Sequence, residues 1–226
     1  MINMGGFVVA IDGPAGAGKT TLARGLAKRL GFDYLDTGAM YRAITLKLLR
    51  MGVIGEPTQW LDCLDGVRLE VSTDPDRFWI RLDGEDVTDR IRSKEVDRYV
   101  SQVSAEPQIR EWMKRRQREL ADEKRIVCEG RDMTTVVFPD AELKIYLDAS
   151  LKERARRRLE QLKQLGISAT MDEIIKNIRF RDRYDSTRPV APLSKADDAI
   201  VIDNTTLSIE AEIEIAAREV MKRLGG

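Results

Sequence analysis

The chain is 226 residues long, 42% of them hydrophobic and 34% charged, and its 38 basic residues balance its 38 acidic ones. This length predicts one domain with a full core and room for insertions, and the zero net charge argues against a nucleic-acid-binding domain, which would be basic. Histidine is absent and cysteine occurs only at Cys63 and Cys128, which excludes His-based acid–base catalysis, most zinc sites and a disulfide framework.

The composition also bears on the compartment. No apolar run is long enough to span a bilayer, and residues 1–6 lack the basic segment that begins a secretory signal. Two cysteines without a disulfide framework fit a reducing environment. We therefore expect a cytoplasmic protein with neither a membrane nor a nucleic-acid partner. The sequence does not fix the oligomeric state, and a monomer is the working expectation.

The first strand and helix of the chain flank a glycine-rich loop. Residues 7–11 form an apolar run that predicts a buried strand, and apolar residues at helical spacing from Leu22 to Leu30 predict a helix beginning at about Lys19. Between them, residues 13–20 carry the pattern Gly-x-x-x-x-Gly-Lys-Thr, typical of a phosphate-binding loop. A turn that only caps a helix is the alternative, but the strand-to-helix junction favours a nucleotide site.

The residue types in this loop suit a nucleoside triphosphate. Glycines let successive backbone N–H groups approach phosphate oxygens, and the helix directs its positive dipole end at the same oxygens. Lys19 adds a full positive charge at the β- and γ-phosphates, and the hydroxyl of Thr20 is placed to ligate Mg²⁺. The predicted ATP-binding residues are Gly13, Pro14, Ala15, Gly16, Ala17, Gly18, Lys19, Thr20 and Thr21.

A second strand and helix follow at once. Residues 31–35 predict a helix end and a short strand, Asp36 or Thr37 is a suitable N-cap, and apolar residues from Tyr41 to Leu49 predict one side of a helix. The order strand, loop, helix, strand, helix is that of doubly wound α/β folds.

Residues 52–106 interrupt this alternation, which predicts an inserted subdomain. Residues 67–71 and 78–82 alternate in polarity as strands do, and a turn cluster lies between them. A further turn at 83–86 leads into 87–88. Together these segments predict a hairpin or a three-stranded antiparallel unit.

The rest of the chain alternates between amphipathic helices and apolar strands. Helices are predicted at about 91–103, 109–120, 151–165, 171–184 and 208–224. Pro107 marks the start of one helix, and the capping-box pattern beginning at Ser150 or Thr170 marks two others. Buried strands are predicted at 125–129, 143–148 and 199–203.

Arginines gather in the second half of the chain. Residues 152–195 include 12 basic and 6 acidic residues, and this local positive field suggests a small polyanionic ligand. Helical spacing places Arg181, Asp185 and Arg188 on one face, where they could close over a triphosphate. A solvated helix held by surface ion pairs would also explain this pattern.

Two further arginines follow strand ends, on the edge of the sheet that binds ligands. These are Arg42 and Arg131, and both suit an acceptor phosphate because a guanidinium group can donate two hydrogen bonds to it. Phosphoryl transfer depends on positioning and charge stabilisation, which such cations supply. For each arginine, the alternative to a phosphate-binding role is an ordinary charged side chain on a helix surface.

Six motifs, in order along nearly the whole chain, resemble the bacterial cytidylate kinase family. They are DGPAGAGK at 12–19, LDTGAMYR at 35–42, GRDMTTVVFPDA at 130–141, LDAS at 147–150, RPVAPL at 188–193 and DNTTLSIE at 203–210. The resemblance implies an α/β, P-loop NTPase-type fold of three layers around a five-stranded parallel sheet, in a single domain over 1–226. It also implies a nucleotide-binding insertion at 52–106 and a lid at 151–190.

The activity implied by the resemblance is phosphoryl transfer from Mg-ATP to CMP or dCMP. Lys19, Arg131 and Arg188 are the implied catalytic residues, with Arg188 reaching the phosphates from the lid. The implied acceptor site places Thr37, Ser101, Arg110 and Asp132 near cytosine, Arg42 and Arg131 at the acceptor phosphate, and Arg181 and Asp185 at the sugar.

The chemistry of cytosine agrees with these assignments. Its exocyclic amino group can donate to the Asp132 carboxylate, and its O2 and N3 can accept from Arg110 and Ser101. Uracil presents an oxygen instead of the amino group, and an unmatched carboxylate would reject it. No general base is required, because a nucleoside monophosphate is already largely ionised at neutral pH.

Two residues depart from the family's pattern. Thr134 stands where glycine is usual, so the loop after Asp132 would need another backbone conformation, whereas Thr37 replaces a common serine and keeps the hydroxyl. Another P-loop kinase, of adenylate, shikimate or dephospho-coenzyme A, is the nearer alternative, which Asp132, Arg110 and the insertion disfavour. A GTPase-type switch protein is the more distant one, and its DxxG and NKxD motifs do not occur in the sequence.

Overall fold

The computed structural model describes residues 6–164 and 166–225. Its centre is a five-stranded parallel sheet in the order β2-β6-β1-β7-β8. The strands are β1 (Phe7–Asp12), β2 (Asp33–Asp36), β6 (Arg125–Glu129), β7 (Leu143–Asp148) and β8 (Ile200–Asp203). This confirms the predicted α/β fold. The interior strands β1 and β6 are buried almost throughout, because both faces of the sheet are covered.

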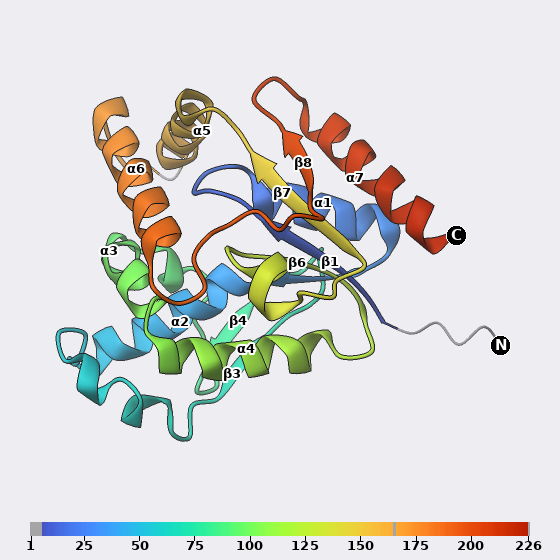
Figure 1. The fold of residues 1–226 in the computed structure, drawn as a ribbon. Coiled ribbons are helices and arrows are strands. Elements are labelled where there is room, and N and C mark those ends of the chain that lie inside the picture. Colours follow the sequence, from blue (N-terminus) through green and yellow to red (C-terminus); the bar gives the residue numbers. More distant parts are fainter. Residues whose placement is uncertain (1–5, 165, 226) are drawn as a thin grey trace.

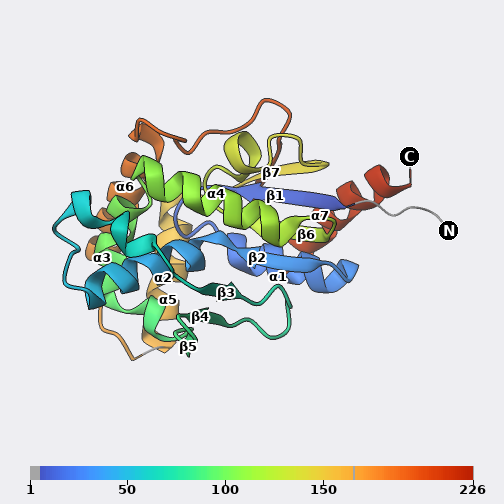
Figure 2. The same cartoon turned by 90° about the horizontal axis from the view of Figure 1, so that it is seen from below.

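Helices cover the sheet on both faces, which gives three layers (Figures 1 and 2). α1 (Lys19–Leu30) and α7 (Ile209–Leu224) share one apolar cluster with β1, β6 and β7. α2 (Thr37–Arg50) and α4 (Pro107–Ala121) pack in a second cluster on the other face. Asp36 rather than Thr37 is the N-cap of α2, since its carboxylate accepts a hydrogen bond from the N–H of Ala39 at 2.8 Å.

Residues 52–106 form a small antiparallel sheet and a helix. The sheet comprises β3 (Leu69–Val71), β4 (Ile80–Leu82) and β5 (Glu85–Asp86), and the helix is α3 (Lys94–Val103). The third strand was predicted at 87–88 and lies two residues earlier. Asp83 and Gly84 both have positive φ, 52° and 85°, so they alone make the turn and residues 85–86 are free to pair.

The helix predicted from residue 91 begins later, at Lys94. Residues Arg90–Arg92 form a 3₁₀ turn instead, and the Ser93 hydroxyl accepts from the N–H of Val96 at 3.2 Å and so caps α3. Further short segments are the 3₁₀ turns Pro57–Gln59 and Asp62–Leu64 and a π-helix, Met133–Val137. The apolar side of the small sheet belongs to the same cluster as α2, so the insertion and the core share packed side chains.

Two helices, α5 (Leu151–Gln164) and α6 (Met171–Thr187), pack on each other through a small apolar cluster of their own. The predicted end of α5, Leu165, lies outside the described residues. α6 continues three residues past its predicted end and stops before Arg188, whose extended backbone suits the residue preceding Pro189. In both views α3, α5 and α6 gather at one end of the molecule, opposite the C-terminal end of α7 (Figures 1 and 2).

None of the helices in the described ranges is both long enough and apolar enough to cross a membrane.

Candidate active site

The glycine-rich loop connects β1 to α1 in a conformation that side chains would prevent. Gly13 has a φ of 156°, and a Cβ built there would lie 2.0 Å from the carbonyl oxygen of Leu147. Gly18 is left-handed at φ 96° and forms the N-cap of α1. The loop therefore presents its backbone N–H groups together with the positive end of the α1 dipole.

Lys19 folds back over this loop. Its Nζ donates to the carbonyl oxygens of Gly13 at 2.8 Å and Pro14 at 2.9 Å, and the side chain is buried. Burial lowers the pKa of Lys19, and the charge of nearby Arg131 lowers it further. A negatively charged ligand in the loop would reverse this shift, because it stabilises the ammonium form.

Thr20 and Glu129 bring two oxygen atoms together beside the loop. The Thr20 hydroxyl donates to Glu129 Oε1 at 2.6 Å, and burial followed by the charge of Asp36 raises the pKa of Glu129. Across residues 6–164 and 166–225, no three carboxylate or thiol side chains gather as a metal site of their own. A magnesium ion here would draw its other ligands from phosphates and water, as Mg²⁺ commonly does.

Glu129 was not predicted as a site residue. The available signal was its position, a carboxylate at the carboxyl end of a buried parallel strand next to the strand that leads into the loop.

A narrow cavity beside the loop brings the predicted acceptor residues together. It offers water about 70 Å³ of space. Every residue predicted for the acceptor site lines it: Thr37, Arg42, Ser101, Arg110, Arg131, Asp132, Arg181, Asp185 and Arg188. They come from four helices, α2, α3, α4 and α6, from the segment that follows β6 and from the residue that follows α6.

Asp132 lines this cavity beside two arginines. Its buried carboxylate forms an ion pair with Arg110, and Arg188 Nη2 lies 3.7 Å from its second oxygen. Arg188, expected at the phosphates, therefore lies at Asp132 in this structure. Thr37 lines the cavity, and its hydroxyl donates to the backbone oxygen of Glu129 at 2.7 Å, so toward a ligand this hydroxyl can act only as an acceptor.

Three further arginines and two carboxylates form a second group of contacts at the cavity. Arg42 pairs with Asp97 at 2.5 Å, and Arg131 Nε pairs with Asp185 at 2.9 Å. Arg181 is half-buried near both of these arginines, and desolvation together with their charges lowers its pKa to about 10. Its Nε is enclosed and makes no hydrogen bond within the described part of the chain. A guanidinium group in this condition would be stabilised by an anion.

The helix pair α5–α6 contacts the glycine-rich loop through residues that sequence reasoning missed. Asp182 Oδ1 accepts from the N–H of Ala15 at 2.9 Å, and its other oxygen pairs with Arg154 at 2.6 Å. Arg157 and Asn204 both donate to the carbonyl oxygen of Ala17. The contacts with the loop join residues 140 to 187 positions apart, and local patterns do not report such distances.

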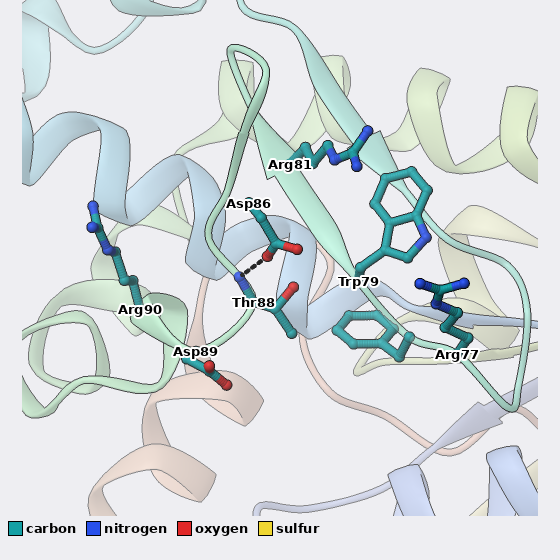
Figure 3. A pocket seen from close by; sticks show the side chains of 8 residues that line it. Arg77, Trp79, Arg81, Asp86, Thr88, Asp89 and Arg90 are labelled. Atoms are coloured by element: carbon teal, nitrogen blue, oxygen red, sulfur yellow. Dashed lines mark hydrogen bonds between the residues drawn. The ribbon is translucent and has the colours of Figure 1, made fainter.

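A second and wider depression lies on the outer face of the small sheet (Figure 3). Its lining residues are Arg77, Phe78, Trp79, Arg81, Asp86, Thr88, Asp89 and Arg90. The Arg81 guanidinium lies 4.8 Å from the centre of the Trp79 ring, and Arg81 stands opposite Glu70 and Asp86 in the strand register. None of the predicted residues is there, so the candidate active site is the cavity beside the glycine-rich loop.

Comparison with known proteins agrees with this geometry. The family model described as cytidylate kinase matches residues 9–222. A protein named cytidylate kinase from Caldanaerobacter subterraneus subsp. tengcongensis is 46% identical over 218 residues, which is 96% of this chain and 96% of that one. Another of this name, from Nocardia farcinica, is 45% identical over 220 residues, which is 96% of this chain and 95% of that one. One from Fervidobacterium nodosum is 47% identical over 206 residues, which is 91% of this chain and 92% of that one.

A solved structure shares the fold at low identity. An uncharacterized protein from Eubacterium ventriosum is similar with a TM-score of 0.52 at 9% identity, over 95% of this chain and 98% of the other. The family match spans nearly all of the sequence and includes both the loop and the residues of the cavity. The chain belongs to the cytidylate kinase family.

Proposed function

We propose that this protein transfers the γ-phosphoryl group of ATP to CMP or dCMP, giving ADP and CDP or dCDP. The enzyme class, a kinase of CMP, is that of its family. The observation that carries the proposal is the single cavity in which all the predicted acceptor residues meet, directly beside the glycine-rich loop. No other arrangement in the described residues puts an anion-binding loop, a lysine and several arginines within reach of one ligand.

The donor triphosphate would bind the backbone amides of residues 13–21. Lys19 would exchange its two carbonyl partners for phosphate oxygens, which are stronger acceptors because they are charged. Thr20 would ligate Mg²⁺, and the Glu129 carboxylate, 2.6 Å from its hydroxyl, would hold the ion or one of its waters. Magnesium would neutralise the β- and γ-phosphate oxygens.

The acceptor would bind with its phosphate toward Arg42, Arg131 and Arg181. Arg42 and Arg131 would hold that phosphate. Arg181, which the resemblance assigned to the sugar, lies near both and would add charge beside them. The transferred group develops negative charge that must be stabilised, and fixed guanidinium groups supply this without rearranging during the reaction. In-line transfer then requires only that these groups keep donor and acceptor aligned.

The base would bind at Asp132 and Arg110. The Asp132 carboxylate would accept from the exocyclic amino group of cytosine, while Arg110 and Ser101 would donate to its ring acceptors. Uracil has an oxygen in place of that amino group. This oxygen and the carboxylate both accept hydrogen bonds, so neither would find a donor in the other. Asp185 would lie near the sugar, where a carboxylate can accept from a hydroxyl.

Entry of the nucleotide would need movement. The cavity of about 70 Å³ is far below the ~300–1,000 Å³ typical of ligand sites. Residues 52–106 and 151–190 enclose it, and they are joined by Arg158–Asp97 at 3.0 Å and to the core by Arg42–Asp97. We therefore propose that these segments act as a nucleotide-binding insertion and a lid. A monomeric, cytoplasmic enzyme without nucleic-acid or membrane partners completes the proposal.

Turnover with CMP, dCMP, UMP and AMP, measured side by side, tests this function. Mg-ATP is the donor, and ADP release is followed in a coupled assay. We expect turnover with CMP and dCMP, little with UMP and AMP, and loss of activity when EDTA removes magnesium. Folded protein that releases no ADP with CMP, or that prefers GTP as its ligand, would refute the proposal.

A further inference from the structure

Asp12 connects the glycine-rich loop to the segment that carries Asp132. It ends β1, directly precedes Gly13 and is fully buried. Its Oδ1 accepts from the N–H of Met133 at 2.9 Å, and its Oδ2 accepts from the N–H and the hydroxyl of Thr134 at 2.8 Å and 2.7 Å. A buried carboxylate is costly without such donors, so the three bonds fix the relative position of the two segments.

These bonds hold the residues that immediately follow Asp132. Met133 and Thr134 are the first two residues of the π-helix Met133–Val137, and N–H groups at a helix start have no partner inside the helix. The carbonyl oxygen of Asp132 in turn accepts from the N–H groups of Val136 and Val137 at 3.0 Å and 3.1 Å. The backbone of Asp132 is thus restrained from both sides, and its side chain is directed toward Arg110.

Thr134 adds the third of these bonds without strain. The non-glycine residues with positive φ in the described ranges are Asp83, Glu123 and Ala191, so Thr134 needs no glycine-like conformation. Its side chain is buried, with 1% exposed. Thr134 stands where the family usually has glycine, and it was expected to change the backbone of this loop. Instead it keeps an ordinary backbone conformation and supplies a hydroxyl donor to Asp12.

We propose that Asp12, assisted by the Thr134 hydroxyl, is a positioning residue for base selectivity. It acts through Met133 and Thr134 to hold the Asp132 carboxylate where the amino group of cytosine can reach it. The inference rests on the proposed function, since it assigns a role in choosing between cytosine and uracil. Because Asp12 is joined to Gly13, the donor loop and the base-recognising residue also share one rigid support.

A purely structural role for Asp12 makes a different prediction. Loss of its hydrogen bonds would then lower the melting temperature and reduce turnover of all acceptors by the same factor. A positioning role changes the ratio between acceptors, because a displaced Asp132 binds cytosine less well and opposes uracil less strongly. KM for ATP stays unchanged when only the Thr134 hydroxyl is removed, since Asp12, the loop glycines and Lys19 are then untouched.

The neighbouring threonines provide a matched pair of variants. The hydroxyl of Thr135 is buried and has no hydrogen-bond partner within the described residues, whereas that of Thr134 bonds to Asp12. Thr134→Val and Thr135→Val therefore remove the same group from adjacent positions. Thr134→Ser keeps the hydroxyl and serves as the conservative rescue, and Asp12→Asn tests the carboxylate itself.

The experiment measures kcat and KM for CMP and UMP at saturating Mg-ATP, with KM for ATP and the melting temperature as further readouts. For Thr134→Val we expect kcat/KM for CMP to fall about tenfold, the loss of one hydrogen bond to a charged group. The CMP-to-UMP ratio of kcat/KM is expected to fall by at least the same factor, because uracil is opposed less strongly. Thr135→Val and Thr134→Ser are expected to keep the wild-type ratio, and Asp12→Asn to lower it further.

An unchanged ratio in folded Thr134→Val would overturn the inference, as would an equal loss for CMP and UMP. This result stays informative if Asp12→Asn does not fold, because Thr134→Val leaves the carboxylate in place. Wild-type protein that phosphorylates no CMP would overturn the proposed function, and this inference with it. Wild-type turnover combined with an unchanged variant ratio overturns the inference alone.

Discussion

Replacing Asp132 with asparagine removes one charge from the cavity while keeping the shape of the side chain. The Asp132 carboxylate is buried, with 3% of its side chain exposed, and it faces Arg110 and Arg188. If it accepts from the amino group of cytosine, the charged hydrogen bond contributes about 1.5–3 kcal/mol, so we expect kcat/KM for CMP to fall by roughly 10- to 150-fold.

The amide of the new asparagine can rotate to donate to the uracil oxygen. One neutral hydrogen bond contributes about 1 kcal/mol, so we expect kcat/KM for UMP to rise roughly fivefold. The CMP-to-UMP ratio then falls by about 50- to 750-fold. Asp132→Ala cannot donate to uracil, so we expect it to lose activity with CMP without gaining any with UMP.

The same change affects stability, because Arg110 and Arg188 lose their common carboxylate. Breaking a buried ion pair costs about 3–5 kcal/mol, which for a chain of this size lowers the melting temperature by roughly 6–20 °C. Circular dichroism and thermal unfolding therefore accompany the coupled ADP-release assay. Asp185→Asn is the matched control, since Asp185 is also buried in the cavity but pairs with Arg131, and we expect it to lower turnover of CMP and UMP alike. A folded Asp132→Asn protein with the wild-type ratio would refute the role given to Asp132.

Three further predictions concern the donor loop. Lys19→Met is expected to lower kcat about a thousandfold, because it removes the charge that would stabilise the transferred group. We expect the protein to stay folded, since the two lost hydrogen bonds to Gly13 and Pro14 are offset by removal of a buried charge. A kcat near wild type in steady-state assays would contradict this. Gly13→Ala is expected to raise KM for ATP at least about tenfold and to lower the melting temperature, since the new Cβ would lie 2.0 Å from the carbonyl oxygen of Leu147. A wild-type KM together with a wild-type melting temperature would contradict the steric role given to Gly13. Burial and Arg131 lower the pKa of Lys19, and a bound triphosphate would raise it again. Mg-ATP binding at about pH 8 is therefore expected to be accompanied by proton uptake. Calorimetry in two buffers of different ionisation enthalpy measures this uptake. Proton release, or equal uptake in Lys19→Met, would contradict this expectation.

Several features of the protein follow from its sequence because they depend on local patterns. The spacing of glycines before Lys19 identifies the phosphate loop, since only that backbone lets amides converge on an anion. Apolar runs and helical periodicity predict the five strands of the parallel sheet and most of the helices. The ordered motifs predict the family, which the comparisons confirm. The family resemblance also predicts a set of acceptor residues, and all of them line one cavity in the structure.

Other features needed the tertiary structure, because they join residues that are far apart in the chain. Asp12 bonds to Thr134 across 122 positions, and Thr20 meets Glu129 across 109. Burial shifts the pKa values of Lys19 and Glu129, and burial is a property of the packed whole. Periodicity describes which face of an element is apolar, but it does not state which polar groups meet when those faces pack. The sequence therefore determines which helices and strands carry the buried charges of this site. Packing determines which partners those charges meet.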